Sequence, residues 1–232
     1  MKPIIVIPTY NERENIMRLI PALFDLQIQN LEVVVVDDNS PDETADTVLK
    51  LKEKYPIYLI KRQRKLGIGT AYVNGFKKAL SLEADIIFEM DADFSHDPKD
   101  IPRLIAALDN ADLAIGSRRI TGGKFVGWGA YRYITSWTAM TLSRLILGLK
   151  TKDVTAGFRA FRRQTLEKIL ERDITSNGYA FQEEILYRTE KNGFKVIEIP
   201  VTFVNRVSGK SKLSTKDIWE FFRVMWRLRF VK

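Results

Sequence analysis

Short apolar runs alternate with helical patterns along the first half of the chain. The apolar runs are rich in Ile and Val and occupy 4–7, 32–36, 57–60, 85–90 and 113–115. The segments between them carry apolar residues at helical spacing and occupy 11–26, 41–51, 67–80 and 98–108. Strands that are apolar on both faces and alternate with helices predict a parallel sheet that is covered on both sides.

The second half of the chain is less regular. A glycine-rich stretch from residue 116 to 129 precedes patterns that predict a helix over 133–147, a strand over 154–161, a helix over 181–191 and a strand over 196–203. The sequence contains no internal repeat, no low-complexity run and no linker rich enough to divide domains. One large domain is therefore expected.

The last 17 residues predict an amphipathic helix with two possible partners. Its apolar stripe consists of Ile218, Phe221, Phe222, Met225 and Leu228. Around the stripe lie the aromatic and basic residues Trp219, Trp226, Phe230, Arg223, Arg227 and Arg229. A basic, aromatic stripe is typical of a helix on an anionic membrane surface. It is equally typical of a terminal helix that docks on its own domain, so both interpretations stay open.

Composition limits the chemistry that the chain can perform. There are no cysteines and one histidine, His96, which excludes thiolate sites and sites with two histidines from one chain. Any metal is therefore bound by oxygen, which favours Mg²⁺ or Mn²⁺. The net charge is +8, and residues 206–232 contribute eight basic against two acidic side chains, or +6. Such a basic end suits an anionic substrate, a membrane surface or nucleic acid, or is an ordinary solvated face.

Three of the predicted strands end in polar clusters, at 8–12, 37–39 and 91–95. The carboxyl ends of parallel strands are the usual ligand site of such a sheet. Asp91 and Asp93 stand one residue apart and can reach one divalent cation, although a solvated acidic turn has the same pattern. Asp38 can accept hydrogen bonds from a ribose or base, or the cluster can cap the next helix.

Two phosphate-loop motifs are incomplete. The glycines at 67 and 69 lack the final small residue of the dinucleotide fingerprint, and Gly209-Lys210-Ser211 lacks the leading glycine because position 204 is Val. Neither a nicotinamide enzyme nor an ATPase is supported. Six cations in loop-like contexts suit phosphate binding or are scattered surface charge: Arg118, Arg119, Arg132, Arg206, Lys210 and Lys212.

Seven segments, in order along the chain, carry a resemblance to a known family. They are PTYNERENI (8–16), VVVVDDNSPD (33–42), DADFSHDP (91–98), IGSRR (115–119), TAGFRAFRR (155–163), GYAFQEEI (178–185) and NRVSGKSKL (205–213). Together they resemble the family 2 glycosyltransferases and, within them, the dolichol-phosphate mannose synthases. The resemblance covers essentially the whole chain.

The resemblance implies an α/β GT-A fold, Rossmann-like, with a mixed and mostly parallel sheet. It divides the chain into a glycosyltransferase domain over 1–217 and an amphipathic helix over 218–232. Within the domain, 1–115 is the nucleotide- and metal-binding half and 116–217 the acceptor half.

The resemblance also assigns site residues. Those that hold the donor nucleotide are Pro8, Tyr10, Glu12, Val36, Asp38, Asp91, Ala92, Arg206 and Lys212. Those that meet Mg²⁺ or Mn²⁺ are Asp91, Asp93 and Ser95, where Ser95 replaces a Gln that some relatives use. Those at the reacting groups are Asp93, Arg118, Arg132 and Ser136, the last three receiving the acceptor phosphate.

The implied reaction is inverting transfer of mannose from GDP-mannose to dolichyl or polyprenyl phosphate. A phosphate acceptor is already anionic at pH 7, so it needs no general base, which is consistent with a single histidine. The alternatives are a glucosyltransferase that uses UDP-glucose and a non-catalytic basic module that binds nucleic acid. No membrane-spanning run is visible, so the enzyme is expected at the cytoplasmic face of a membrane, alone or with a small membrane subunit, and without nucleic acid.

Overall fold

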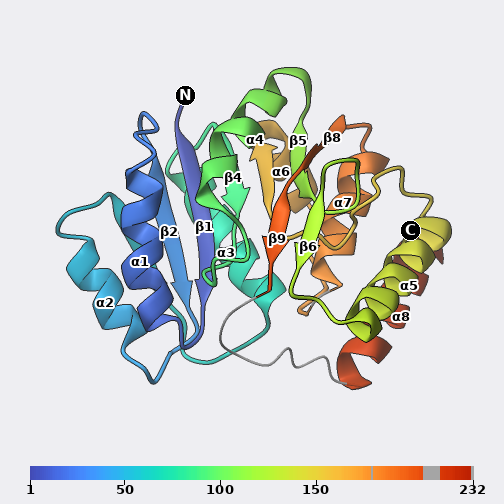
Figure 1. Cartoon of the computed structure of the whole chain (residues 1–232), viewed down its shortest axis with the longest axis horizontal. Coiled ribbons are helices and arrows are strands. Elements are labelled where there is room, and N and C mark those ends of the chain that lie inside the picture. Colours follow the sequence, from blue (N-terminus) through green and yellow to red (C-terminus); the bar gives the residue numbers. More distant parts are fainter. Residues whose placement is uncertain (179, 206–214, 231–232) are drawn as a thin grey trace.

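A seven-stranded sheet with helices on both faces forms the body of the molecule (Figure 1). The computed structural model describes residues 1–178, 180–205 and 215–230, and of 130–132 and 215–220 it describes the backbone. The strand order is β3-β2-β1-β4-β7-β5-β8. These strands are β1 (Pro3–Thr9), β2 (Glu32–Asp37), β3 (Ile57–Lys61), β4 (Ile86–Glu89), β5 (Leu113–Ser117), β7 (Arg159–Arg162) and β8 (Val196–Pro200).

The sheet is mixed because one strand runs against the others. β1 pairs in parallel with β2 and β4, and β5 pairs in parallel with β8, whereas β7 lies antiparallel between β4 and β5. A second sheet pairs β6 (Lys124–Val126) with β9 (Thr202–Val204) in parallel. The predicted mixed, mostly parallel α/β fold is confirmed.

Two apolar cores follow from the alternation of side chains along each strand. In β2, Val33 and Val35 face one core while Val34 and Val36 face the other, as the two-residue period of a strand requires. The first core lies under α1 (Arg13–Phe24), α2 (Thr44–Leu51) and α4 (Ile101–Ala107). The second lies under α3 (Ile68–Ser81), α5 (Ala130–Leu147), α6 (Arg163–Leu170), α7 (Phe181–Lys191) and α8 (Thr215–Phe230).

Two predicted strands differ from the observed ones. The strand expected over 154–161 begins only at Arg159, because the buried Arg159 guanidinium takes the carbonyls of Val154 and Ala156 as acceptors. The strand expected over 196–203 divides at Val201. The Val201 N–H donates to the carbonyl of Ser117 on β5, and the Val201 carbonyl accepts from the N–H of Lys124 on β6. The chain therefore leaves the large sheet and enters the small one at this residue.

The C-terminal helix α8 docks on its own domain with one face and exposes apolar residues on another. Val224 and Met225 are 1% exposed and pack in the second core against α5 and α7. Trp226 and Phe230, in contrast, are 66% and 60% exposed. Helices α5 and α8 lie side by side at the end of the molecule opposite α1 and α2 (Figure 1). In the described part of the chain, no helix is both long and apolar enough to cross a membrane.

Helix α3 lies so close to the sheet at Gly75 that a larger residue would not fit there. A Cβ at Gly75 would lie 2.1 Å from Cγ1 of Val6 on β1, which is far inside van der Waals contact. We expect Gly75→Ala to lower the free energy of unfolding by about 1–3 kcal/mol, despite the better helix propensity of Ala. Urea denaturation measures the effect, with the exposed Asn74→Ala on the same helix as control. A Gly75→Ala protein as stable as the control would contradict this packing.

Candidate functional site

The two carboxylates that follow β4 are held in place by neighbouring side chains. The Tyr72 hydroxyl donates to Oδ1 of Asp91 over 3.1 Å, and the Asp91 N–H donates to Nδ1 of His96 over 3.2 Å. The Ser95 N–H donates to Oδ1 of Asp93 over 3.0 Å. Both carboxylates are half-buried at the carboxyl edge of the sheet, as the sequence predicts. Their orientation is therefore set before any ligand binds.

The donor atoms at this turn fit a hard divalent cation. The Ser95 side chain is 2% exposed, and its hydroxyl has no hydrogen-bond partner among the described residues. Because the backbone N–H of the same residue donates to Asp93, this hydroxyl is a candidate third oxygen donor near the two carboxylates. Within the described ranges, no three His, Asp or Glu side chains gather as a metal cluster. Two carboxylates are the usual protein share of a Mg²⁺ shell that substrate phosphates and water complete.

The single histidine serves this turn as a neutral ring. His96 is buried and stacks on Phe158 with ring centroids 4.9 Å apart. Burial lowers the pKa of His96 to about 4, against the raising effect of the nearby Asp93 carboxylate. Because its Nδ1 accepts from Asp91, the neutral tautomer carries its proton on Nε2. The sequence analysis gave His96 no role, and its place five residues after Asp91 was the available signal. Residues 91–96 are called the metal turn below, after the cation predicted to bind there.

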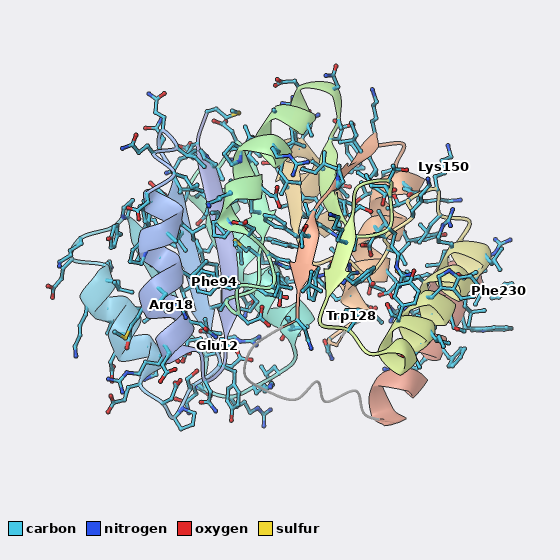
Figure 2. The ribbon with its side chains drawn as sticks, viewed as in Figure 1. Glu12, Arg18, Phe94, Trp128, Lys150 and Phe230 are labelled. Atoms are coloured by element: carbon cyan, nitrogen blue, oxygen red, sulfur yellow. The ribbon has the colours of Figure 1, made fainter. Side chains whose placement is uncertain are left out.

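The predicted nucleoside residues surround the ends of β1 and β2. Asp38 is buried and forms an ion pair with Arg62, which also donates to Thr70. Tyr10 is exposed, and the Lys65 ammonium lies 4.4 Å from its ring centroid. Pro8, Glu12 and Val36 lie at the same edge, with Val36 fully buried. Figure 2 shows Glu12, Arg18 and Phe94 together on the α1 side of the molecule. The sequence analysis missed Arg62, although it directly follows β3.

Asp37 and Asp38 have different partners, which the sequence could not distinguish. The buried Asp37 carboxylate accepts from the Thr9 hydroxyl and from the N–H and hydroxyl of Ser40. It therefore holds the loop after β2. Asp38 instead pairs with Arg62, which follows β3.

On the other side of the metal turn, Arg118 is held inside the protein. Its guanidinium donates to both carboxylate oxygens of Asp153, over 2.8 and 2.6 Å, and to the Thr155 hydroxyl over 2.9 Å. Burial would raise the pKa of Asp153, but Arg118 keeps it below its ordinary value. The predicted contact between Arg118 and a phosphate stays a prediction, and it would require this pair to open.

Arg119, the next residue, turns toward α5. Its Nη2 donates to Oγ of Ser136 over 3.4 Å, and its guanidinium lies 4.8 Å from the ring centroid of Phe125 and 4.6 Å from that of Tyr133. Ser136 thus reaches the edge where the sequence predicts it, but its partner is Arg119. Arg206 and Lys212, and the side chain of Arg132, lie outside the described residues.

An aromatic cluster joins this side to the metal turn. Rings lie within 6 Å of one another, centroid to centroid, in a series that links His96 to α5. The members are Phe158, His96, Phe203, Trp128, Phe125 and Tyr133. Figure 2 shows Trp128 on the β6 side of the molecule. The cluster therefore connects the turn that carries Asp91 and Asp93 with the helix that carries Ser136.

Comparison with known proteins agrees with this geometry. Residues 4–170 match the sequence profile of Glycosyl transferase family 2. The chain belongs to this family. A matching profile over this much of the chain makes it a glycosyltransferase, and not the basic nucleic-acid-binding module that was the alternative.

Curated relatives at about 40% identity include the following proteins. The chain is 43% identical to the undecaprenyl-phosphate mannosyltransferase of Micrococcus luteus over 92% of this chain and 88% of that protein. It is 42% identical to the polyprenol monophosphomannose synthase of Mycolicibacterium smegmatis, over 98% and 88%. It is 40% identical to the dolichol-phosphate mannosyltransferase of Pyrococcus furiosus over 98% of this chain and 64% of that longer protein.

Solved structures confirm the fold. Glucosyl-3-phosphoglycerate synthase from Mycobacterium tuberculosis, in complex with Mn²⁺, UDP and glucosyl-3-phosphoglycerate, superposes with a TM-score of 0.72 at 18% identity. The match covers 100% of this chain and 81% of that chain. The same enzyme with Mg²⁺ and UDP gives a TM-score of 0.72 at 17% identity, over 100% and 80%.

The hydroxyl of Tyr72 gives a direct test of the metal turn. Its ring stacks on Phe181 and its only polar atom holds Asp91, so Tyr72→Phe removes the hydrogen bond and keeps the packing. We expect affinity for Mn²⁺, measured by electron paramagnetic resonance with nucleoside diphosphate present, to fall about 10-fold or more. Tyr55→Phe, at a tyrosine that stacks on Phe24 far from the turn, is the control. Unchanged Mn²⁺ affinity in Tyr72→Phe would show that Asp91 needs no such support.

Proposed function

We propose that this enzyme transfers mannose from GDP-mannose to a polyprenyl phosphate, with inversion at the anomeric carbon. One observation supports this most: the carboxylates of Asp91 and Asp93 and the arginines at the end of β5 lie at one edge of the sheet, and α5, which contacts Arg119 through Ser136, carries exposed apolar residues. The names of the three relatives, all mannose transferases or synthases on polyprenyl carriers, give the sugar and the class of acceptor.

The donor would lie along the ends of β1, β2 and β4. Asp38, held by Arg62, would receive the base or ribose, while Pro8, Tyr10, Glu12 and Val36 would line the nucleoside. Asp91, Asp93 and Ser95 would hold Mg²⁺ or Mn²⁺, with Ala92 beside the nucleotide. When bound, this ion neutralises charge on the leaving diphosphate. Arg206 and Lys212 remain proposed diphosphate contacts.

The main barrier to the acceptor's approach is charge repulsion, and no proton has to be removed from it. Its phosphate oxygen is already anionic, but it must approach a sugar diphosphate of the same sign. Cations with forked N–H groups reduce that repulsion and fix the direction of attack. Arg118, Arg132 and Ser136 remain the proposed contacts of the acceptor phosphate. None of these roles requires a general base, in agreement with the neutral His96.

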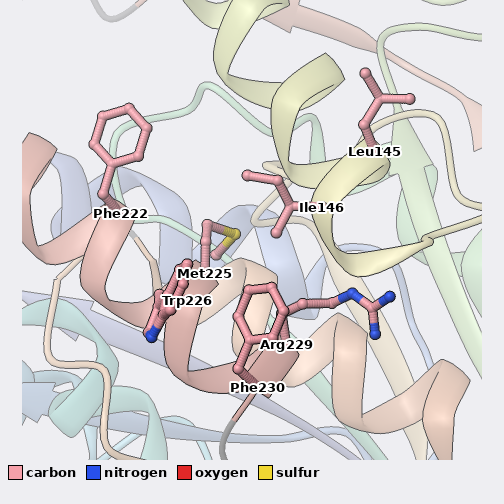
Figure 3. A pocket seen from close by; sticks show the side chains of 7 residues that line it. All are labelled: Leu145, Ile146, Phe222, Met225, Trp226, Arg229 and Phe230. Carbon is pink, nitrogen blue, oxygen red and sulfur yellow. The ribbon is translucent and has the colours of Figure 1, made fainter.

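The acceptor's hydrocarbon chain would be met by the exposed surface of α5 and α8. Between these helices lies an open cavity of about 540 Å³, lined by Leu145, Ile146, Phe222, Met225, Trp226, Arg229 and Phe230 (Figure 3). Exposed aromatic rings beside Arg229 have the character of a helix at an anionic lipid interface. We propose that this surface rests on the cytoplasmic face of a membrane, with or without a small membrane subunit.

The reaction itself tests the proposed function and its metal. We expect the wild-type protein to convert GDP-mannose and polyprenyl phosphate, with Mg²⁺ or Mn²⁺, into a β-linked polyprenyl-phosphate mannose. Asp93→Asn should lower turnover about 100-fold or more, because the metal loses a charged ligand. Thin-layer chromatography of labelled lipid measures the product, and Asp109→Asn, exposed and distant, is the control. Transfer from UDP-glucose but not GDP-mannose, or near-normal turnover in Asp93→Asn, would contradict the proposal.

Membrane association is tested at the exposed half of α8. Because Val224 and Met225 are core residues, removing the helix would expose the core, so substitution of exposed residues is the cleaner experiment. We expect Trp226→Gln with Phe230→Gln to reduce co-sedimentation with vesicles that contain anionic lipid about 10-fold or more, without a change in melting temperature. Leu49→Gln on α2, which is 51% exposed, is the control. Equal loss in the control, or full vesicle binding by the double variant, would place the membrane contact elsewhere.

A further inference from the structure

A buried carboxylate lies two residues before Asp91, at the end of β4. Glu89 is fully buried, and by the two-residue period of a strand it faces the same side of the sheet as Ile87, toward α3 and α7. The Arg159 guanidinium and the Gln182 side chain lie nearby. Even so, neither carboxylate oxygen of Glu89 meets the geometry of a hydrogen bond among the described residues. A buried charge in this state costs free energy of folding.

The cation opposite Glu89 is bonded to the backbone instead. Arg159 on β7 faces Glu89 across the antiparallel ladder, and its Nε lies 3.9 Å from Oε2 of Glu89. Its guanidinium donates to three backbone carbonyls over 2.8, 3.0 and 2.9 Å, those of Ala156, Gln182 and Val154. It also lies near Glu183, a second buried carboxylate, on α7. Arg159 therefore has acceptors and a counter-charge that do not depend on Glu89.

Another buried pair in the same protein shows how a structural ion pair is built. Asp153 accepts two hydrogen bonds from the Arg118 guanidinium and one from the Arg118 N–H. Glu89 accepts none from Arg159, although both carboxylates are fully buried. Asp153 thus neutralises and orients its arginine. What Glu89 adds to its part of the core is mainly its charge.

The charge of Glu89 reaches the metal turn. The Tyr72 hydroxyl donates to Asp91, and the pKa of this buried phenol is raised well above its ordinary value. Burial is the largest cause, followed by the charges of Asp91 and Glu89 and, more weakly, of Asp93. Three carboxylates therefore create a negative electrostatic potential at one place, and two of them are the predicted metal ligands.

Glu89 can act on a cation at this place through space. Two positions along an extended chain correspond to about 7 Å. Within the part of the chain that the structure describes, no three acidic or histidine side chains gather as a metal cluster, so Glu89 is not expected as a third ligand. Coulombic attraction between a carboxylate and a divalent cation remains appreciable over such a separation in a buried surrounding. Loss of Glu89 would also leave the charge of Arg159 to repel the cation.

We propose that Glu89 supports the cation site electrostatically: its buried charge strengthens the binding of Mg²⁺ or Mn²⁺ by Asp91 and Asp93 without contact with the ion, and offsets the opposing charge of Arg159. This inference rests on the proposed function, because it presupposes the cation. It gives the buried pair between β4 and β7 a task at the donor site.

The test measures Mn²⁺ binding to the whole chain by electron paramagnetic resonance, with GDP or UDP present. The pH is 8, because burial raises the pKa of Glu89 to about 7, against the lowering effect of Arg159. We expect Glu89→Gln to weaken Mn²⁺ binding about 10-fold, and Glu89→Asp, which keeps the charge, to bind within about threefold of the wild type. Glu32→Gln is the matched control, since Glu32 pairs with Lys2 at the amino end of β2. It should bind Mn²⁺ as the wild type does.

A double variant separates charge from packing. Glu89→Gln with Arg159→Gln removes both charges, so the repulsion by Arg159 is lost as well. We expect this protein to bind Mn²⁺ more tightly than Glu89→Gln alone, whereas a packing defect would make the double variant weaker. Circular dichroism shows whether each variant is folded at the assay temperature. Should the double variant not fold, the comparison of Glu89→Asp with Glu89→Gln decides alone.

Wild-type Mn²⁺ affinity in Glu89→Gln, or equal losses in Glu89→Gln and Glu89→Asp, would overturn the inference and leave the proposed function standing. So would a folded double variant that binds Mn²⁺ more weakly than Glu89→Gln. A wild-type protein that binds no Mn²⁺ with either nucleoside diphosphate would overturn the inference together with the proposed cation. A loss in Glu89→Gln that Glu89→Asp recovers supports the inference even if mannose is not the sugar transferred.

Discussion

The ion pair between Arg118 and Asp153 fixes the end of β5 relative to the rest of the sheet. Asp153 takes both the Arg118 backbone N–H and its guanidinium, and thereby ties the end of β5 to the loop before β7. Glu198 on β8 accepts from the N–H groups of Lys152 and Asp153, so the same loop is also bound to the next strand. Removing one partner of such a buried pair leaves an uncompensated charge and costs about 3–5 kcal/mol. The aromatic cluster and α5 depend on this anchor for their position beside the metal turn.

The charge distribution of the edge fits the two anionic substrates of the proposed reaction. Carboxylates at Asp91 and Asp93 attract a cation and repel a bare phosphate, so they suit a diphosphate only with the metal present. The proposed acceptor phosphate needs the opposite environment, and the arginines that follow β5 lie on the far side of β7 from these carboxylates. Neutral groups separate the two regions: His96 is uncharged at physiological pH, and the rings of Phe203 and Trp128 follow it. In the proposed reaction, this separation would let two anions approach one sugar without sharing one binding group.

The sequence predicted most strands of the sheet, because each strand is marked by a run of apolar residues within its own segment. The runs at 4–7, 32–36 and 57–60 were apolar on both faces, and all three lie in the sheet as expected. The break of 196–203 at Val201 was not predictable, because it depends on Ser117 and Lys124, which are distant in sequence. The late start of β7 was not predictable either, because it depends on the burial of the Arg159 side chain over the preceding carbonyls. The sequence analysis also missed β6 and α6, which are short and carry weak periodic patterns.

The motifs predicted which residues lie at the candidate site, but not which side chains each of them contacts. Asp91 and Asp93 follow a strand, so their place was set by topology. Arg118 and Arg119 are adjacent in sequence, but Arg118 pairs with Asp153, 35 residues away, whereas Arg119 contacts Ser136 and Tyr133. Arg62 and Tyr72 act through Asp38 and Asp91, and no local pattern reveals such contacts.

The central claim is that donor and acceptor phosphates occupy neighbouring but separate sites across the metal turn. Paramagnetic relaxation of ³¹P tests it directly, with Mn²⁺ and nucleoside diphosphate bound and a non-reacting isoprenyl phosphonate as the acceptor. Our account predicts strong relaxation of the phosphonate phosphorus, corresponding to about 10 Å from Mn²⁺, and its disappearance in Arg132→Gln at the same ligand concentration. A phosphorus coordinated directly to Mn²⁺, or one that Mn²⁺ leaves unrelaxed, would contradict the account.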